Sequence, residues 1–380
     1  MKILADQNIP SVADAFRDLG EVRLMPGRDI RREHLQDCRC LITRTVTRVD
    51  RDLLDGTPVE FVGTATIGTD HIDLEYLQTA GIGCSNAAGC NAEAASEYVI
   101  SGLFALSKHK GFDPFRLKAG IVGHGNVGSR LKLKLDALGI DCLVCDPPLQ
   151  EAGDSSQDFV ALDMILRECN FISLHVPLTR EGRHPTYHLF DKDRLQNLAA
   201  GCLLVNAARG EVVDNAALLE LLHQRDDLSV FLDTWEGEPL VSRELLRRVD
   251  LATPHIAGYS VEGRLRGTQM ILDAACAHFG LESGWHMSTL LPANQKLDCD
   301  LSRPGLAAWT ELFRLHCNIW RDHEALVAGA TLGDDDFAAH FDGLRRVYPD
   351  RLEYPRFNIN RATAGLPLTT LQQLGFELSD

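Results

Sequence analysis

Short apolar runs alternate with segments of helical spacing through most of residues 1–290. Most runs are only a few residues long and end at polar, glycine or proline positions, which is typical of strands buried in a parallel sheet. Strands that alternate with helices predict βαβ units, whose parallel sheets bind ligands at the carboxyl ends of their strands. The predicted strands have the sequences KILAD, CLIT, FVGTAT, KAGIVG, DCLVCD, FISLHV, GCLLVN, SVFLDT and VDLATP.

Two longer helical segments predict how the chain is divided. They cover residues 91–110 and 260–279, and each is long enough to bridge two α/β units. A chain that crosses twice between two units would form a hinge and a cleft. We therefore predict an α/β fold with two Rossmann-like, doubly wound parallel-sheet domains, an interdomain cleft and a small C-terminal α/β domain. The predicted boundaries are residues 1–90 with 256–285, residues 91–255 and residues 286–380.

The pattern changes after about Gly284. Residues 290–305 are predicted to form an irregular linker, followed by two helices with apolar and aromatic stripes, the second with a possible N-cap in the GDDD sequence at 333–336. The stripes are either the core of a small third domain or an oligomer interface, because so short a segment has little room to bury two tryptophans alone. They consist of Leu306, Trp309, Phe313, His316 and Trp320, and of Phe337, Phe341 and Leu344.

The composition is that of a globular protein with an acidic surface. Of 380 residues, 45% are hydrophobic and 24% charged, with a formal net charge of -16. This charge argues against nucleic acid or an anionic membrane as the main partner, although local arginines can still bind a small anion. Because no apolar run approaches the roughly 20 residues of a membrane span and the N-terminus lacks the features of a signal peptide, we expect a cytoplasmic protein.

The eleven cysteines are scattered through apolar segments. Cys142 and Cys145 form a C-x-x-C pair, but they lie in a predicted strand rather than in a turn before a helix. Structural thiols are therefore predicted rather than a redox pair. No second C-x-x-C pair and no H-E-x-x-H sequence occurs, so no metal site is predicted.

A glycine-rich turn follows the predicted strand at 118–122. Gly123, Gly125 and Gly128 form a G-x-G-x-x-G sequence, in which they would permit a tight turn, close approach of a pyrophosphate and close helix packing, respectively. The next strand ends at Asp146, 18 residues beyond Gly128. A carboxylate at this position would bind the adenosine ribose and repel a 2′-phosphate, so the sequence favours NAD over NADP. Gly123 to Gly128 and Asp146 are therefore the predicted cofactor site.

Three consecutive strands of the same predicted sheet end in polar groups. Arg209 follows the strand at 201–206, Glu236 and Glu238 follow the strand at 229–234, and His255 follows the strand at 249–254. Taken alone, Arg209 is better explained as a surface arginine in a loop. As a set, these residues suggest a reaction. The guanidinium of Arg209 could hold the carboxylate of a substrate, and a glutamate beside His255 would fix the tautomer of the imidazole, which could then accept the proton of a substrate hydroxyl.

These motifs resemble those of the D-isomer-specific 2-hydroxyacid dehydrogenases. The resemblance is carried by GHGNVG, Asp146, NAARGEVVD, DTWEGEP and TPHIAG, and it implies NAD-dependent oxidation of a 2-hydroxy acid. It implies that Arg209 binds the substrate carboxylate, that His255 is the acid/base, and that Glu238 rather than Glu236 is the partner of His255. The implied cofactor contacts are Gly123, Gly125, Asn126, Val127, Gly128, Asp146, His175, Pro177, Ala207, Asp233 and Gly258.

A narrower resemblance within this family covers essentially the whole chain. MKILADQNIP, TRTVTRVD, GTATIGTDHID and PHIAGYSVEG, with the C-terminal extension, are similar to members that oxidise 4-phospho-D-erythronate on the bacterial route to pyridoxal 5′-phosphate. It implies that Thr45, Thr66 and Tyr259 contact substrate. Arg44 is either a partner of the substrate phosphate, which needs a cation, or an ordinary surface arginine. We expect a homodimer through residues 286–380, with residues 91–255 binding NAD and the first domain binding substrate.

Two alternatives remain open at this stage. One is another enzyme of the same chemistry, such as a 3-phosphoglycerate or glycerate dehydrogenase. Against it stand Tyr259, which suits a polyhydroxylated substrate, and a C-terminal segment that does not have the pattern of a βαββαβ regulatory module. The other is a non-catalytic, NAD-sensing binding module, which an intact Arg, Glu and His set does not exclude.

Overall fold

The structure is a computed structural model that describes residues 1–297, 305–361 and 365–379. The chain divides into two compact units: unit 1 comprises residues 1–91 and 260–292, and unit 2 comprises residues 92–259 and 293–380. Each unit contains a large sheet whose strands are all parallel. The predicted α/β class is therefore confirmed.

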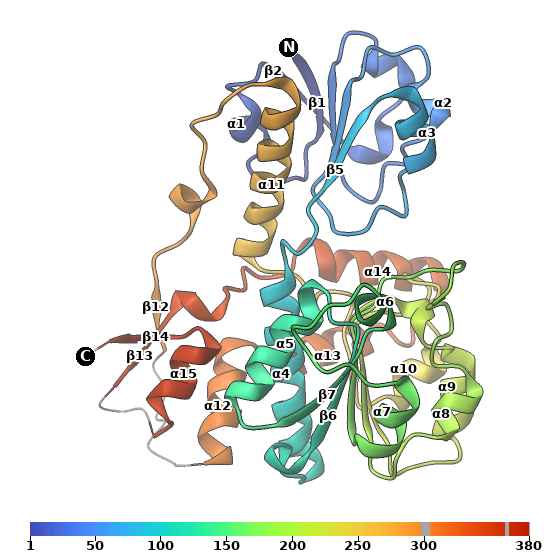
Figure 1. The fold of residues 1–380 in the computed structure, drawn as a ribbon, viewed down its shortest axis with the longest axis vertical. Helices are drawn as coiled ribbons and strands as arrows, with labels where there is room; N and C mark the ends of the chain where they lie inside the picture. The colour runs from blue at the N-terminus through green and yellow to red at the C-terminus, as the bar shows by residue number, and fades with distance from the viewer. Residues whose placement is uncertain (298–304, 362–364, 380) are drawn as a thin grey trace. The chain divides into compact units, whose positions relative to one another are not determined.

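Unit 1 has a five-stranded sheet in the order β2-β1-β3-β4-β5 (Figure 1). Its helices begin where the sequence supplies caps: the carboxylates of Asp50 and Asp73 accept backbone N–H groups of the first turns of α2 and α3. The strands are β1 (Lys2–Asp6), β2 (Glu21–Met25), β3 (Cys40–Thr43), β4 (Phe61–Thr64) and β5 (Gly83–Asn86). The helices are α1 (Val12–Phe16), α2 (Arg51–Leu54), α3 (Leu74–Ala80) and α11 (Val261–Phe279).

Unit 2 has a six-stranded sheet in the order β11-β10-β9-β8-β6-β7. The strands β8, β9 and β10 are buried along their whole length, as expected for a parallel sheet covered by helices on both faces. The strands are β6 (Lys118–Val122), β7 (Asp141–Cys145), β8 (Phe171–Leu174), β9 (Leu203–Asn206), β10 (Ser229–Leu232) and β11 (Leu251–Ala252). The helices before residue 260 are α4 (Ala92–Lys110), α5 (Asn126–Ala137), α6 (Pro147–Glu151), α7 (Leu162–Glu168), α8 (Lys192–Gln196), α9 (Asn215–Leu222) and α10 (Arg243–Arg248).

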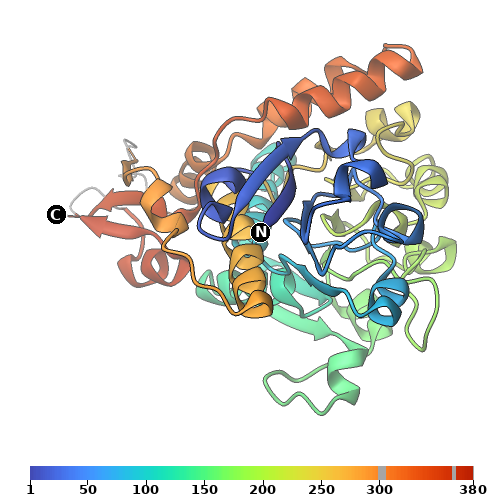
Figure 2. The ribbon, with the colours of Figure 1, turned by 90° about the horizontal axis from the view of Figure 1, so that it is seen from above.

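The C-terminal part of unit 2 adds helices and a small parallel sheet in the order β12-β13-β14. Figures 1 and 2 show this sheet at one end of unit 2, where the chain terminates. Its elements are β12 (Gln295–Lys296), α12 (Leu306–His316), α13 (Ile319–Ala328), α14 (Asp334–Arg346), β13 (Phe357–Asn360), α15 (Leu368–Leu374) and β14 (Glu377–Ser379). Residues 298–304 of the predicted linker lie outside the described residues.

The first aromatic stripe is part of the core of unit 2. Trp309 and Phe313 are buried, and the Phe313 ring lies 4.7 Å from the ring of Phe104 in α4. This contact supports the core interpretation for these side chains. The stripe runs along two helices rather than one, because Cys317 has an extended backbone and ends α12. In α14 the N-cap is Gly333 without a side-chain hydrogen bond, so the GDDD acids favour the helix dipole in the first turn instead of capping it.

All nine predicted strands are present; β1 and β3 have the predicted ends, and the other seven are shorter than predicted. Two strands of unit 1, β2 and β5, and the three strands of the C-terminal sheet were not predicted. The predicted bridging helices correspond to α4 and α11.

The division into three domains stays a prediction, because the C-terminal residues share unit 2 with the second sheet. Among the described residues, none of the helices combines the length and apolarity that a membrane crossing requires.

The C-x-x-C pair lies within a strand, as predicted. Cys142 and Cys145 are in β7, and both are free thiols. Burial raises the pKa of Cys142 to about 12 and that of Cys145 to about 11. Since the thiolate is the reactive form, these thiols are poor redox groups near neutral pH.

A buried polar pair joins α4 to the C-terminal helices. Glu97 is 1% exposed, and its Oε2 lies 3.3 Å from Nε2 of His316, which also lies 2.9 Å from the carbonyl oxygen of Leu352. Burial raises the pKa of Glu97 well above its usual range and lowers the pKa of His316 to about 3. The folded protein therefore holds this pair in its neutral forms at neutral pH.

We predict that Glu97→Gln becomes progressively more stable than the wild type as the pH rises. The folded wild type keeps a proton on Glu97, whereas the unfolded chain releases it above a pH of about 4.3. The wild type therefore loses stability as the pH rises toward the folded pKa of Glu97, at up to about 1.4 kcal/mol per pH unit. Urea unfolding of both proteins between pH ~5 and ~8 measures the difference.

Glu93→Gln is the control for this measurement. Glu93 lies one turn earlier in α4, is partly exposed and is paired with Lys134. Its replacement should not give a stability difference that grows in this way with pH. A constant difference between Glu97→Gln and the wild type across the range would contradict the assignment of a proton to Glu97.

Candidate active site

The glycine-rich turn has the three features that the sequence predicts. Gly123 has a φ of 95°, and a Cβ atom there would lie 2.6 Å from the carbonyl oxygen of His175. A Cβ atom on Gly128 would lie 1.9 Å from the carbonyl oxygen of Gly123, whereas one on Gly125 would meet nothing within 4 Å. Gly123 and Gly128 are therefore required by the local packing, and Gly125 borders open space at the start of α5.

Asp146 lies beside this turn, at the end of β7. Its Oδ2 accepts a hydrogen bond from the backbone N–H of His124 at 2.7 Å, and its Oδ1 accepts one from Leu149 at 3.1 Å, which caps α6. These bonds fix the carboxylate next to the glycine-rich turn. Each carboxylate oxygen has a further lone pair with which it can accept a hydrogen bond from a ribose hydroxyl.

Two histidines near the turn have buried ring nitrogens without a partner. Among the described residues, Nδ1 of His124 and Nδ1 of His175 have no hydrogen-bond partner, while Nε2 of His175 lies 2.8 Å from Oγ of Ser173. Burial lowers the pKa of His175 to about 3, so its ring is neutral. Unpartnered polar atoms together with open space at Gly125 fit a polar ligand such as NAD.

The predicted cofactor positions occupy different parts of unit 2. Asn126 and Val127 form the first turn of α5, where backbone N–H groups favour an anion. Pro177 is exposed, and its carbonyl oxygen accepts a hydrogen bond from Thr186 Oγ1 at 2.5 Å. Ala207 and Gly258 are half-buried and follow β9 and β11, respectively. Their contacts with the cofactor stay predictions.

The three predicted catalytic residues follow neighbouring strands. Arg209 follows β9, Glu238 follows β10 and His255 follows β11, and these strands are adjacent and parallel. Their carboxyl ends therefore meet at one edge of the sheet. Arg209 donates through Nη1 to the carbonyl oxygen of Ala208 at 2.8 Å. A Cβ atom on the next residue, Gly210, would lie 2.0 Å from the backbone of Trp235, so only glycine allows the two loops to touch.

Glu238 and His255 form the predicted pair. Nδ1 of His255 lies 2.5 Å from Oε1 of Glu238, and both side chains are partly exposed. Burial alone would raise the pKa of Glu238, but the charge and hydrogen bond of His255, together with Arg345, lower it. The carboxylate therefore remains ionised and holds Nδ1, so that Nε2 is the ring nitrogen available for proton transfer.

Asp233 shapes the loop that carries His255. Asp233 is 1% exposed, and Thr253 Oγ1, the N–H of Ile256 and the N–H of Ala257 donate to its carboxylate at 2.6, 2.9 and 3.0 Å. The resemblance implies that Asp233 contacts the cofactor. The structure adds a role in holding the histidine loop, for which the sequence contains no local signal.

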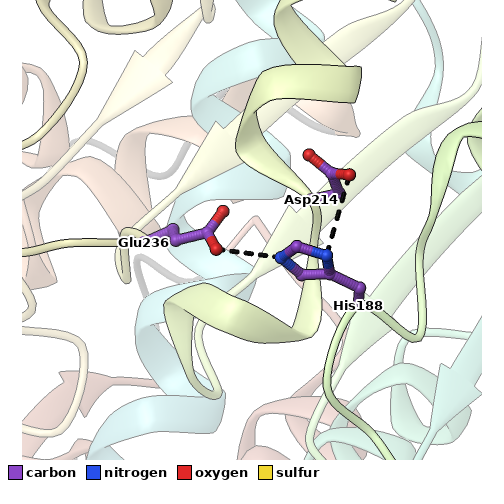
Figure 3. A group of neighbouring side chains, drawn as sticks. All are labelled: His188, Asp214 and Glu236. Atoms are coloured by element: carbon purple, nitrogen blue, oxygen red, sulfur yellow. Dashed lines mark hydrogen bonds and ion pairs between the residues drawn. The ribbon is translucent and has the colours of Figure 1, made fainter.

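Glu236 is bonded to His188 and not to His255. Nε2 of His188 lies 2.8 Å from Oε1 of Glu236, and Nδ1 lies 3.7 Å from Oδ2 of Asp214 (Figure 3). Glu236 Oε2 also accepts the N–H of Asn215 at 3.2 Å. The structure therefore brings Glu238, and not Glu236, together with His255. No sequence pattern pointed to His188.

This cluster also bears on the predicted absence of a metal. Within the described residues, His188, Asp214 and Glu236 are the one group whose ligand atoms lie within 4.8 Å of one another, as a shared ion would need. However, each ring nitrogen of His188 already faces a carboxylate, and Asp214 also caps α9. These contacts join three segments, which precede α8, precede α9 and follow β10, and the metal question stays untested.

Three of the four predicted substrate residues lie in unit 1. Arg44 and Thr45 follow β3, and Thr66 follows β4, so they lie at the carboxyl edge of that sheet. Arg44 donates through Nε to the buried carboxylate of Asp6 at 3.0 Å, which satisfies part of its charge. Thr66 Oγ1 lies 2.7 Å from Thr64 Oγ1. These contacts do not decide between the two interpretations of Arg44.

Comparisons with known proteins identify the family. Residues 88–257 match the model of the D-isomer specific 2-hydroxyacid dehydrogenase, NAD binding domain. The erythronate-4-phosphate dehydrogenase of Stutzerimonas stutzeri is 48% identical and covers 93% of this chain and 93% of its own. The enzyme of the same name from Klebsiella pneumoniae is 45% identical over 99% of this chain and 98% of its own. The chain belongs to the erythronate-4-phosphate dehydrogenase family. The predicted family and NAD as cofactor are thereby confirmed.

Solved structures support the fold. The 3-phosphoglycerate dehydrogenase of Entamoeba histolytica, bound to NAD⁺, matches with a TM-score of 0.62 at 24% identity, over 74% of this chain and 95% of its own. A D-lactate dehydrogenase from Aquifex aeolicus matches with a TM-score of 0.59 at 23% identity, over 74% and 96%. Members of the erythronate-4-phosphate dehydrogenase family thus share the fold of dehydrogenases with other substrates.

We predict that Asp146→Asn weakens the preference for NAD over NADP. Asparagine has one acceptor oxygen in place of two, so it can keep the α6 cap or accept the N–H of His124 but not both, and it lacks the charge that repels a 2′-phosphate. The ratio of kcat/KM for NAD to that for NADP should fall about tenfold, equivalent to about 1.4 kcal/mol. Asp141→Asn, at the exposed opposite end of β7, is the matched control and should keep the wild-type ratio. An unchanged ratio in Asp146→Asn would remove Asp146 from the ribose role.

We predict unequal effects for the two glutamates of one loop. Glu238→Gln removes the charge that stabilises protonated His255, so kcat should fall by about two orders of magnitude or more. Glu236→Gln keeps the Glu238–His255 pair, so kcat should fall less than about tenfold. Steady-state kinetics of both variants measure the difference, with circular dichroism as a check on folding. Equal losses in kcat would contradict the assignment of Glu238.

Proposed function

We propose that this protein oxidises 4-phospho-D-erythronate at C2 to 2-oxo-3-hydroxy-4-phosphobutanoate, with NAD as the oxidant, in the biosynthesis of pyridoxal 5′-phosphate. The observation that carries the proposal is the Glu238–His255 pair at the sheet edge that Arg209 also reaches. Near full-length relatives that bear the name of this activity, at 43–48% identity, support the choice of substrate.

The chemistry needs a base for the C2 hydroxyl. His255 takes that proton through Nε2, because its Nδ1 is bonded to Glu238. Glu238 stabilises the imidazolium that forms and fixes the orientation of the ring. When bound, NAD accepts the hydride from C2, which leaves the 2-oxo acid and NADH. In the reverse direction the same nitrogen returns the proton to the oxygen.

The substrate also needs groups that orient it. The Arg209 guanidinium is suited to the carboxylate next to C2, since its planar fork matches two oxygens. Tyr259 lies four residues after His255, in the same loop, and its hydroxyl suits a hydroxyl of the substrate. Arg44, Thr45 and Thr66 complete the proposed substrate set, with Arg44 as a candidate for the phosphate. Association as a homodimer through residues 286–380 is also part of this proposal.

A panel of acids tests the proposal. We predict that kcat/KM with NAD is at least about tenfold higher for 4-phospho-D-erythronate than for 3-phospho-D-glycerate or D-glycerate, because the proposed contacts of Tyr259 and Arg44 would hold its additional hydroxyl and its more distant phosphate. Production of NADH at 340 nm is the measurement. Faster turnover of 3-phospho-D-glycerate would overturn the substrate and favour the related dehydrogenase.

The same panel separates the enzyme from a binding module. His255→Ala should lose activity with every acid that the wild type oxidises. If the wild type and His255→Ala are equally inert with the entire panel although both bind NAD, the protein is a non-catalytic NAD-binding module.

A further inference from the structure

The C-terminal segment contacts the loop that carries the acid/base histidine. Arg351 is buried, and its Nη2 donates to the carbonyl oxygen of Ala257, two residues after His255. The same nitrogen lies 3.4 Å from the carbonyl oxygen of Ala94, and the guanidinium lies 4.6 Å from the centre of the Tyr98 ring in α4. One arginine thus ties the histidine loop to α4.

A second arginine of this segment reaches further toward the reacting groups. Arg345 lies in the last turn of α14, with its guanidinium carbon 5.9 Å from the centre of the Tyr259 ring. The ring of Tyr348, three residues later, meets that of Tyr259 edge-on at 6.0 Å. Arg345 of α14 and Tyr259, a predicted substrate residue, are therefore neighbours within unit 2.

The guanidinium of Arg345 is only weakly compensated by its own helix. Its Nη1 lies 3.7 Å from Asp342 Oδ1, and its buried Nε has no hydrogen-bond partner among the described residues. This buried charge acts on the acidic groups around it. Burial raises the pKa of Glu238, and the field of Arg345 acts with His255 to lower it.

We propose that Arg345 is a positioning residue for the oxidation, acting through the Glu238–His255 pair and through the ring of Tyr259. The proposal rests on the function proposed above. It extends the role of the C-terminal segment beyond association of subunits, because α14 then contributes one charge to the acid/base machinery.

The charged and titratable groups around the pair determine the sign of the effect. Glu238 meets His255, the N–H of Trp235 and the field of Arg345, while Glu236 is engaged with His188. The guanidinium of Arg345 lies beside the ring of Tyr259 and the carboxylate of Asp342, and its charge acts on Glu238. Loss of its charge lets the pair take up a proton at higher pH. The acidic limb of the kcat/KM profile for oxidation should therefore move to higher pH.

Arg345→Gln, Arg345→Lys and Arg346→Gln test this proposal. In Arg345→Gln we expect the acidic limb to move up by about half a pH unit or more and kcat to fall about tenfold, with little change in KM. Arg345→Lys keeps the charge and should return the limb toward its wild-type position. Arg346 is the next residue of the same helix and is exposed, so Arg346→Gln makes the same charge change without the contact and should keep the wild-type profile.

Two results would overturn the proposal. One is an identical pH profile for Arg345→Gln and Arg346→Gln. The other is an equal loss of activity in Arg345→Gln and Arg345→Lys, with a lower melting temperature and no movement of the limb, which would make Arg345 a support of the fold only.

A measurement without turnover separates this proposal from the proposed function. The pKa of the Glu238 carboxyl can be followed by ¹³C NMR in protein with labelled glutamate, using Glu238→Gln to assign the signal. In Arg345→Gln this pKa should be higher than in the wild type, whichever acid the protein oxidises. An unchanged pKa would refute the proposal even if 4-phospho-D-erythronate proves to be the substrate.

Discussion

The buried carboxylate of Asp233 is the interaction on which the catalytic geometry depends. His255 has a φ of 55°, a left-handed conformation that a residue other than glycine adopts only where its surroundings impose it. Asp233 imposes it by accepting three hydrogen bonds from the chain on both sides of His255, while its own carbonyl oxygen accepts the N–H of His255 at 2.7 Å. A charge buried this deeply is tolerated because each bond compensates for lost solvation.

Much of the fold follows from the sequence because the strands of a parallel sheet are apolar along their whole length. KILAD and CLIT form β1 and β3 with the predicted ends. In contrast, β2 has the sequence EVRLM with no fully buried residue, and β5 has the sequence GCSN. Edge strands of this kind carry no hydrophobic run, so only pairing with β1 or β4 defines them. The same holds for the short strands of the C-terminal sheet.

The site divides in the same way into local and non-local parts. Gly123, Asp146, Arg209 and His255 are candidates from the sequence because each lies in a short motif at a strand end, whereas the choice of Glu238 over Glu236 rests on the family resemblance. Arg345, Arg351 and His188 could not be predicted, because they meet their partners across long stretches of chain; even for Arg345, the pattern of its helix does not say which residues the helix will meet. His188 approaches Glu236 from 48 residues away, and Arg351 approaches Ala257 from 94. Such contacts depend on packing that no local pattern encodes.

The C-terminal segment also stabilises the edge strand β11, which lies directly before His255. The last strand, β11, has two residues and lies at the edge of the sheet, where unpaired N–H groups weaken a strand and invite wrong pairing. His323 of α13 accepts the outward N–H of Ala252 through Nδ1 at 3.0 Å, which requires this nitrogen to be unprotonated, and burial lowers the pKa of His323 in agreement.

Arg247, from the helix before β11, donates to the carbonyl oxygen of Ala330 at 2.7 Å. The 3-phosphoglycerate and D-lactate dehydrogenase structures each match 74% of this chain while covering nearly all of their own, so they offer no counterpart for about a quarter of it. In this chain, the strand that precedes the predicted acid/base histidine is completed by residues of the C-terminal part of unit 2. Loosening α13 or α14 would therefore act on the acid/base pair before it acted on the cofactor site.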